Sequence, residues 1–309
     1  MNRREFLTGG AGALALGAAG CKTGGAASCA CSGKTGVPFR LGVAGITLSK
    51  FKFEPALAEL KKWDVAWFCA KDFHFPLKAS AAELKSLVAR AADSGVRLYA
   101  AGPVYICSAD EAKRTFDYAA ALGVPTLVGV PAELDPGAKS AWSGGKSSRK
   151  MCELCAKLAD EYRIDFAIHN HGANPKTGNP RLYPTVASTM ALIRDLSPRI
   201  GLCVDVAYTR ADGYDPSEVL RAHAPRVFDV HLRNTAIVGN GSSGAAADRG
   251  VIDYVKVLRT LCDIGYDRVC GLELGNAYAK PSDVNPGADP TWVPRSIGYF
   301  RGVMDALAS

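Results

Sequence analysis

The segment Asp165-Phe166-Ala167-Ile168-His169 is a strand-length apolar run that ends in a side chain suited to binding a divalent metal. Three later segments repeat this pattern, each after an intervening helical pattern: Ile200-Gly201-Leu202-Cys203-Val204-Asp205, Val227-Phe228-Asp229-Val230-His231 and Val269-Cys270-Gly271-Leu272-Glu273. A parallel barrel places the C-terminal ends of all its strands at one mouth. We therefore expect the four terminal side chains to converge on one point.

The chain from residue 39 onward alternates between strand and helix patterns throughout. Before the four segments above, strands are expected at 39–48, 64–70, 96–101 and 124–130. Helices are expected at 54–62, 80–95, 108–123, 147–162, 186–196, 215–224, 251–264 and 293–307. Ser80 with Glu83 and Ser108 with Glu111 have the spacing of capping boxes. Because strand-helix units of this number and length close a barrel, the sequence predicts a single (β/α)8 TIM barrel over residues 39–309.

The residues before the barrel resemble a bacterial export segment. Arg3 and Arg4 precede a weakly hydrophobic stretch rich in Gly and Ala, which resembles a twin-arginine signal. The apolar part, residues 7–19, is shorter than the roughly 20 residues that span a bilayer. The stretch Leu16-Gly17-Ala18-Ala19-Gly20-Cys21 also resembles a lipobox, which would make Cys21 the lipidated residue.

These features predict three parts of the chain: a signal with a lipobox-like end at 1–21, a flexible tether at 22–38, and the barrel at 39–309. The tether assignment follows from the Gly, Ala, Ser and Lys content of the segment, which lacks periodicity. We expect an exported protein, periplasmic or held at the cell envelope as a lipoprotein by the twin-arginine pathway. Contact with a membrane would then be made only through the N-terminal lipid.

Composition excludes some partners and leaves others open. The formal net charge is +7, but no basic run with interleaved aromatic residues is present, so nucleic acid is not expected as a partner. The chain has ten cysteines, several inside strand patterns, where Cys behaves as a small apolar residue. Cys152 and Cys155 form a C-x-x-C pair on a helical pattern, for which two packed thiols are favoured over a zinc or redox pair. Oligomeric state is left open.

Two imidazoles and two carboxylates at the ends of consecutive strands would form a mixed nitrogen and oxygen site. Such a site suits Mn, Zn, Fe or Co better than Ca, and we expect one divalent ion, with Mg also open. The expected ligands are His169, Asp205, His231 and Glu273.

Other polar side chains follow the strands at the same mouth. They include Lys71 and His74 after the second strand, Tyr105 after the third and Glu133 after the fourth. Lys71 could stabilise an enediolate oxygen, act as acid or base, or form an ion pair with a neighbouring carboxylate. His171 shares the inward face of its strand with His169, so it could be a substrate contact, the true ligand, or a partner of the ligand.

The chain resembles the sugar phosphate isomerase/epimerase family of xylose-isomerase-like barrels over roughly residues 39–307. The resemblance rests on Ala167-Ile168-His169-Asn170-His171-Gly172, Gly201-Leu202-Cys203-Val204-Asp205, Asp229-Val230-His231-Leu232-Arg233, Gly271-Leu272-Glu273 and Arg249-Gly250-Val251-Ile252-Asp253. It implies one divalent ion at the four strand ends and proton movement on a sugar carbon beside a carbonyl. Glu273, His169 and Lys71 are then the expected catalytic residues. The expected substrate contacts are His74, Tyr105, Glu133, His171, Tyr208 and Arg233.

The sequence departs from the family's ketose epimerases at two places. Their fifth-strand ligand is a Glu that serves as one of two opposed bases, whereas this chain has His169, and their Asp-x-x-His motif reads Asp205-Val206-Ala207-Tyr208. His-Asn-His on the fifth strand is similar to inosose dehydratase-like proteins. We therefore expect elimination or hydration beside the carbonyl of a 3-keto sugar or glycoside, with ketose 3-epimerisation or aldose-ketose isomerisation as alternatives. A non-catalytic sugar-binding envelope lipoprotein and a metal-dependent phosphodiesterase or endonuclease are the other hypotheses.

Overall fold

The computed structural model describes residues 36–171, 182–236, 244–275, 278 and 289–309. The predicted signal, most of the predicted tether and Cys21 lie outside this part of the chain. Within it, no helix is both long and apolar enough to cross a membrane.

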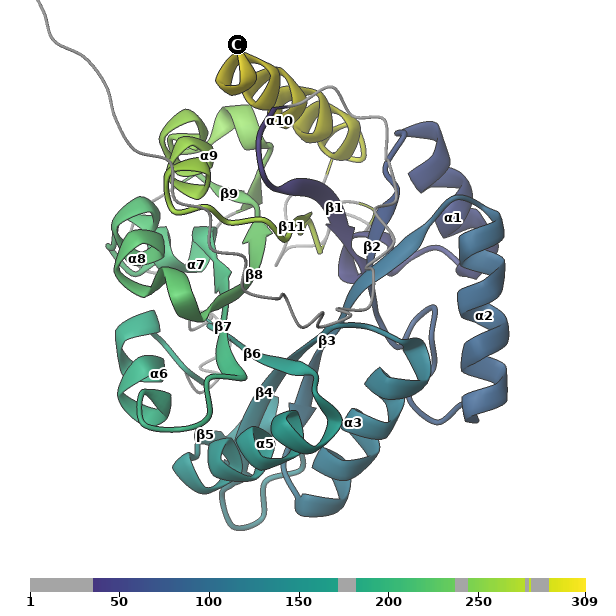
Figure 1. The fold of residues 1–309 in the computed structure, drawn as a ribbon, viewed down its shortest axis with the longest axis vertical. Helices are drawn as coiled ribbons and strands as arrows, with labels where there is room; N and C mark the ends of the chain where they lie inside the picture. The colour runs from purple at the N-terminus through teal and green to yellow at the C-terminus, as the bar shows by residue number, and fades with distance from the viewer. Residues whose placement is uncertain (1–35, 172–181, 237–243, 276–277, 279–288) are drawn as a thin grey trace, which may run out of the picture. The chain divides into compact units, whose positions relative to one another are not determined.

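Parallel strands form a closed ring at the centre of the molecule (Figure 1). Their order around the ring is β3-β2-β1-β11-β8-β7-β6-β4, and a pairing between β3 and β4 closes it. These strands are β1 (Arg40–Ala44), β2 (Trp67–Ala70), β3 (Arg97–Ile106), β4 (Thr126–Leu134), β6 (Asp165–His169), β7 (Ile200–Asp205), β8 (Val227–Leu232) and β11 (Val269–Leu272). The predicted parallel barrel is confirmed.

Helices surround the ring on its outside (Figure 1). The longer ones are α1 (Phe53–Lys62), α2 (Ala81–Asp93), α3 (Ala109–Leu122), α5 (Arg149–Tyr162), α6 (Val186–Ile193), α8 (Pro216–His223), α9 (Tyr254–Asp263) and α10 (Trp292–Ala308). Each of these helices lies within a few residues of a predicted helix. The prediction succeeds because the apolar residues at helical spacing form the face of each helix that packs against the strands.

Serine side chains begin two of these helices as predicted. Ser80 accepts from the Glu83 backbone N–H, and the Glu83 carboxylate accepts from the Ser80 N–H at 2.7 Å, which is a reciprocal capping box. Ser108 likewise accepts from the Glu111 N–H, but the Glu111 carboxylate accepts from the Cys107 N–H at 2.7 Å instead. The second predicted box is therefore only half formed.

Several short elements at the loops were not predicted. The predicted first strand, 39–48, is wrong at its end, because β1 stops at Ala44 and a 3-10 helix (Gly45–Leu48) follows it; β3 and β4 run beyond their predicted ends. The extension of β4 pairs with an antiparallel strand, β5 (Gly145–Ser147), after the short helix α4 (Ala141–Gly144). The remaining short elements are α7 (Val206–Ala211), a 3-10 helix (Ala224–Arg226), the hairpin strands β9 (Asn234–Thr235) and β10 (Gly244–Ala245), and a 3-10 helix (Ala247–Arg249).

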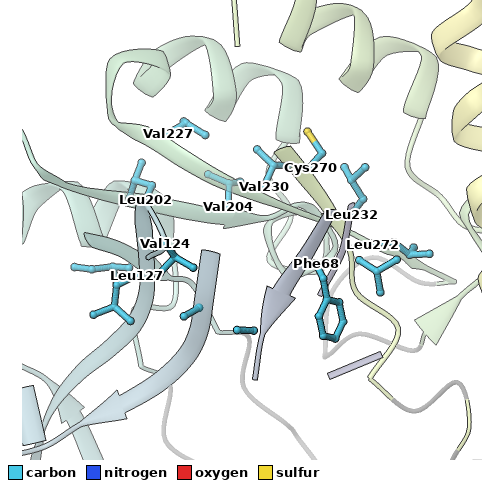
Figure 2. Close-up of a cluster of buried hydrophobic side chains, with 14 of the residues drawn as sticks. Phe68, Val124, Leu127, Leu202, Val204, Val227, Val230, Leu232, Cys270 and Leu272 are labelled. Atoms are coloured by element: carbon cyan, nitrogen blue, oxygen red, sulfur yellow. The ribbon is translucent and has the colours of Figure 1, made fainter. Parts of the chain in front are cut away.

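Alternate residues of each barrel strand face opposite sides. The outward set belongs to the large hydrophobic core between strands and helices (Figure 2): Leu202, Val204, Val230, Leu232, Cys270 and Leu272. The intervening residues face the barrel interior, where Ala167 and Cys203 join a smaller cluster with Tyr99 and Val128. This alternation places Asp205, His231 and Glu273 on the inward face, at the strand ends.

The cysteines behave mainly as apolar packing residues. Cys152 and Cys155 are buried on α5 as free thiols, and Cys152 Sγ lies 3.3 Å from the buried Tyr183 hydroxyl. Burial raises the pKa of both thiols, which makes them poor nucleophiles at neutral pH. Two packed thiols account for this pair.

Candidate metal centre at the barrel mouth

Four side chains from consecutive strands meet at one end of the barrel. His169 and Asp205 are the last residues of β6 and β7, His231 lies near the end of β8, and Glu273 directly follows β11. The parallel register sets Asp205 beside His231. One nitrogen or carboxylate oxygen from each of the four lies within 4.8 Å of those of the other three.

The distances among these atoms suit a single ion. Nε2 of His169 lies 3.1 Å from Nδ1 of His231, which lies 3.1 Å from Oε2 of Glu273. Nε2 of His169 is also 3.8 Å from Oε2 of Glu273 and 4.0 Å from Oδ2 of Asp205. Ligands that each bind a zinc-type ion at about 2.0–2.2 Å lie no more than about 4.4 Å apart. The donor set and these separations therefore fit one divalent ion.

Asp205 is fully buried and held on both carboxylate oxygens. Its Oδ1 accepts from the Tyr208 N–H at 2.8 Å, which makes Asp205 the N-cap of α7. Its Oδ2 accepts from Nε of Arg233 at 2.8 Å. Burial raises the pKa of Asp205, and the Arg233 guanidinium opposes that rise. The backbone N–H of Asp205 donates to Oδ1 of Asn170 at 2.8 Å, so the neighbouring strand fixes its position.

Glu273 and His231 shift each other's pKa in opposite directions at the centre of the cluster. Burial raises the pKa of Glu273, but His231 and His169 outweigh burial and hold it well below its ordinary value. Burial lowers the pKa of His231, but Cys203, Glu273 and Asp229 raise it to well above its ordinary value. Glu273 is therefore ionised at neutral pH and available as a ligand and as a proton acceptor.

The two histidines of the His-Asn-His motif have different neighbours. His169 contributes Nε2 to the four-residue cluster. His171 lies with Nε2 3.3 Å from the Tyr105 hydroxyl, and the two rings stack with centroids 5.7 Å apart. The rings of His169 and His171 are also in contact, at 4.5 Å between centroids. The structure thus places His169 at the predicted metal position and His171 beside it, toward Tyr105.

Tyr208 and Arg233 form the wall next to Asp205. The Arg233 guanidinium lies 3.9 Å from the centroid of the Tyr208 ring, a cation–π contact. The Tyr208 ring also meets the His169 ring edge-on and the His171 ring at an inclined angle. Burial raises the pKa of the Tyr208 hydroxyl, so this phenol remains protonated and can donate a hydrogen bond.

Lys71 reaches the mouth from the end of β2. Its side chain is 17% exposed, its ammonium donates to the Pro103 carbonyl, and it lies 4.0 Å from the Asp72 carboxylate. Burial lowers the pKa of Lys71, while Asp72, Cys69 and Glu273 raise it, and the net shift is downward. The ammonium therefore releases its proton more readily than that of an exposed lysine.

Two of the predicted substrate contacts lie apart from the cluster. His74 is buried with Nε2 3.1 Å from the Leu48 carbonyl, and its ring packs against Phe68, so it links the loops after β1 and β2. Glu133 is half-buried on the extension of β4, paired across to Lys146 of β5. Neither residue belongs to the group of four possible ligands.

The xylose isomerase-like TIM barrel family matches residues 57–301, which is most of the chain. The chain belongs to this family. No curated protein sequence matches it.

Solved structures share the fold of this xylose isomerase-like barrel at low sequence identity. D-psicose 3-epimerase crystallised with D-fructose has a TM-score of 0.65 and 16% identity, covering 86% of this chain and 100% of its own. The IOLI protein with a zinc atom has a TM-score of 0.64 and 17% identity, covering 88% and 98%. The probable 3-DHS dehydratase AsbF of Bacillus anthracis has a TM-score of 0.60 and 11% identity, covering 88% and 99%.

In this xylose isomerase-like barrel, the segment Arg249–Asp253 has a structural role that the sequence motif did not reveal. Asn234 Oδ1 accepts from the Ile252 N–H at 3.1 Å, and an added Cβ on Gly250 would lie 2.0 Å from that same oxygen. Gly250 therefore lets the segment approach Asn234 closely. Asp253 then caps α9 by accepting from the Lys256 N–H at 3.0 Å.

Sequence reasoning missed two polar residues that support the ligands. Asn170 positions Asp205 as described above, and Asp229 lies 3.2 Å from His231 through its Oδ2. The alternation of side chains along a strand could have identified Asp229. Asp229 precedes His231 by two residues and therefore shares its inward face. A carboxylate on that face is buried, and buried carboxylates need a partner.

Proposed function

We propose that this family member is a divalent-metal-dependent enzyme that removes a proton from the carbon beside a sugar carbonyl. We further propose that it completes the reaction by losing or adding water on a 3-keto sugar or glycoside. The observation that carries the proposal is the convergence of His169, Asp205, His231 and an ionised Glu273, with the buried Lys71 at the same mouth.

The proposed ion would act as a Lewis acid on the substrate. A divalent cation bound by the four side chains would polarise the substrate carbonyl and acidify the neighbouring C–H bond. The donor set suits Zn, Mn, Fe or Co, and a zinc atom in the IOLI protein, which has the same fold, supports a metal at this mouth.

The chain's own residues have separate roles in the elimination. The carboxylate of Glu273 takes the proton from carbon, and the electron pair of that C–H bond becomes the second bond of a new carbon–carbon double bond. The bond between the adjacent carbon and its hydroxyl oxygen breaks, and this oxygen leaves as water after taking the proton of Lys71. Hydration is the reverse sequence. The hydroxyl of Tyr208 and the imidazole of His171 would orient the sugar through hydrogen bonds.

Elimination is favoured over inversion because the two sides of the cluster are chemically unequal. Inversion at one carbon needs a base on each face of the substrate, and here Glu273 is a carboxylate while the other candidate, His169, is an imidazole in contact with two further imidazoles. A dehydratase and an epimerase both share the fold, so both outcomes are open to experiment. Phosphodiester hydrolysis would call for further metals, but among the residues described here the two groups of possible ligands overlap in His169 and His231.

The test begins with metal content. The purified full chain should hold about one divalent ion, and Asp205→Ala or Glu273→Ala should lose it because each removes a charge that holds the cation. Glu133→Ala, outside the cluster, is the matched control and should keep the ion. Full occupancy in both ligand variants would refute the site.

The reaction is tested with 3-keto-glycosides in deuterated water. Deuterium at the carbon beside the carbonyl and an unsaturated or hydrated product should appear, and Glu273→Gln should slow the reaction by about 100-fold or more. If the only product is the epimer of a free ketose, the ketose 3-epimerase alternative replaces this proposal. Sugar binding without exchange of any C–H proton would support the non-catalytic alternative.

We also propose that the enzyme is exported and held at the cell envelope. The proposal rests on Arg3, Arg4 and the lipobox-like segment ending at Cys21. Oxidised glycosides outside the cytoplasm would then be its substrates.

A further inference from the structure

His231 presents its two ring nitrogens to two different carboxylates. Nδ1 lies 3.1 Å from Oε2 of Glu273 and 3.1 Å from Nε2 of His169, inside the four-residue cluster. Nε2 forms no hydrogen bond with the described part of the chain, but it lies 3.2 Å from Oδ2 of Asp229, within ion-pair distance. The imidazole is therefore positioned between the proposed metal site and a carboxylate that is not one of the four ligands.

Asp229 is built into the barrel interior below the mouth. It is 1% exposed and precedes His231 by two residues on β8, so both side chains share the inward face. Its Oδ1 accepts from the Val230 N–H at 2.9 Å, and its Oδ2 lies 3.6 Å from the Cys203 thiol, which donates to it. These two contacts fix the orientation of the carboxylate toward His231.

We infer that Asp229 is the positioning residue of the metal site: it accepts the Nε2 proton of His231 and so leaves Nδ1 free to bind the cation. Metal-binding histidines usually donate their other ring N–H to a carboxylate or carbonyl, which sets the tautomer and the ring orientation. The opposite tautomer would place its proton on Nδ1, in the space between Glu273 and His169, and a cation could not bind there. The inference rests on the metal site of the proposed function but on no part of its reaction.

The packing around Asp229 is consistent with a dedicated role. The carboxylate lies in the barrel interior beside Cys203, which belongs to an apolar cluster with Tyr99, Val128 and Ala167. Burying an ionised carboxylate in apolar surroundings is costly unless a charged or strongly donating group accompanies it. His231 is that group, and the pairing explains why a carboxylate rather than an apolar residue stands at this level of the barrel.

The direct test is the position of the proton on His231. The chain has five histidines, so labelling them with ¹⁵N gives a simple long-range proton–nitrogen correlation spectrum of the full protein. In the Zn²⁺-loaded wild type, His231 should carry its proton on Nε2 and none on Nδ1. A Zn²⁺-loaded His231 with its proton on Nδ1 would overturn the inference, and this measurement needs no variant to fold.

The second test is Zn²⁺ affinity, measured by competition with a chelator and without any substrate. Asp229→Asn preserves the shape of the side chain but removes its charge, and should weaken Zn²⁺ binding by about 10- to 100-fold. Asp165→Asn is the control, because Asp165 lies at the start of β6, at the opposite end of that strand from His169, and pairs with Arg199 and Arg268. Equal affinity in wild type and Asp229→Asn would refute the inference.

The two proposals fail in different ways. Tight Zn²⁺ binding with the expected His231 tautomer, but no reaction with any keto sugar, would overturn only the proposed function. If the reaction occurs, but His231 carries its proton on Nδ1 in the Zn²⁺-loaded protein or Asp229→Asn binds Zn²⁺ as tightly as the wild type, only the role of Asp229 is overturned.

Discussion

The guanidinium of Arg233 neutralises Asp205, a fully buried carboxylate at the proposed metal site, through a bond of 2.8 Å from Nε to Oδ2. The same guanidinium lies over the Tyr208 ring. The backbone N–H of Tyr208 donates to Oδ1, the other carboxylate oxygen of Asp205. In the metal-free protein, Arg233 therefore supplies positive charge that a bound cation would also supply.

Replacing Arg233 with Met should destabilise the metal-free protein and increase its dependence on metal. Removing one partner of a buried ion pair costs about 3–5 kcal/mol, because the remaining charge stays buried and unpaired. A cation would restore the balance, so the rise in Tm on adding Zn²⁺ should be larger for Arg233→Met than for the wild type. The control is Arg221→Met, which breaks a surface pair with Asp263. The same Zn²⁺-induced rise in both variants would contradict the charge argument.

Lys71 should set the alkaline limit of activity. If its ammonium protonates the leaving oxygen, activity falls as the pH rises through the pKa of Lys71. Burial lowers that pKa, so the fall should begin at a lower pH than an exposed lysine would give. Lys71→Met should reduce the rate by about 100-fold and abolish this limb of the pH profile. Lys62→Met, at an exposed site, should change neither, and an unchanged alkaline limb in Lys71→Met would rule out the acid role.

Gly271 and Tyr99 should show a strong coupling in stability. An added Cβ on Gly271 would lie 2.1 Å from the Tyr99 hydroxyl, so Gly271→Ala should destabilise the protein by about 1–3 kcal/mol through overpacking. Removing that hydroxyl in Tyr99→Phe should recover most of this loss in the double variant. Urea unfolding of both single variants and the double variant measures the coupling.

Tyr99→Phe alone should be neutral or stabilising, because in the described structure its buried hydroxyl has no hydrogen-bond partner. Gly298→Ala is the control for alanine substitution itself, since nothing lies within 4 Å of its added Cβ. Additive effects of Gly271→Ala and Tyr99→Phe would show that the predicted clash does not occur.

The export proposal is tested at the start of the chain. Replacing Arg3 and Arg4 together with Lys should block export, because the twin-arginine pathway recognises the arginine pair. Replacing Cys21 with Ala should release a soluble protein, because lipid would be the only anchor. Cell fractionation and immunoblotting measure both results. Export of the Lys-Lys protein at the normal level would exclude this pathway.

The fold could be predicted because its information is local. Helical periodicity, the Ser80 capping box and apolar strand runs each act within a few residues, and a parallel barrel then fixes which strand ends meet. The short elements β5 and α7 could not be predicted in this way. Each depends on a tertiary feature: β5 pairs with the extended end of β4, and α7 begins at Asp205, which caps it.

The sequence by itself determined that His169, Asp205, His231 and Glu273 converge, since these residues end their strands in the same way. Only the tertiary structure decided the direction in which the pKa values of Asp205, His231 and Glu273 shift, which nitrogen of His231 faces the site and where His171 lies. Those properties depend on contacts between strands, such as Arg233 with Asp205 and Tyr105 with His171, and electrostatic interactions are strong only after burial has removed water. Residues far apart in sequence acquire these interactions only when the barrel closes.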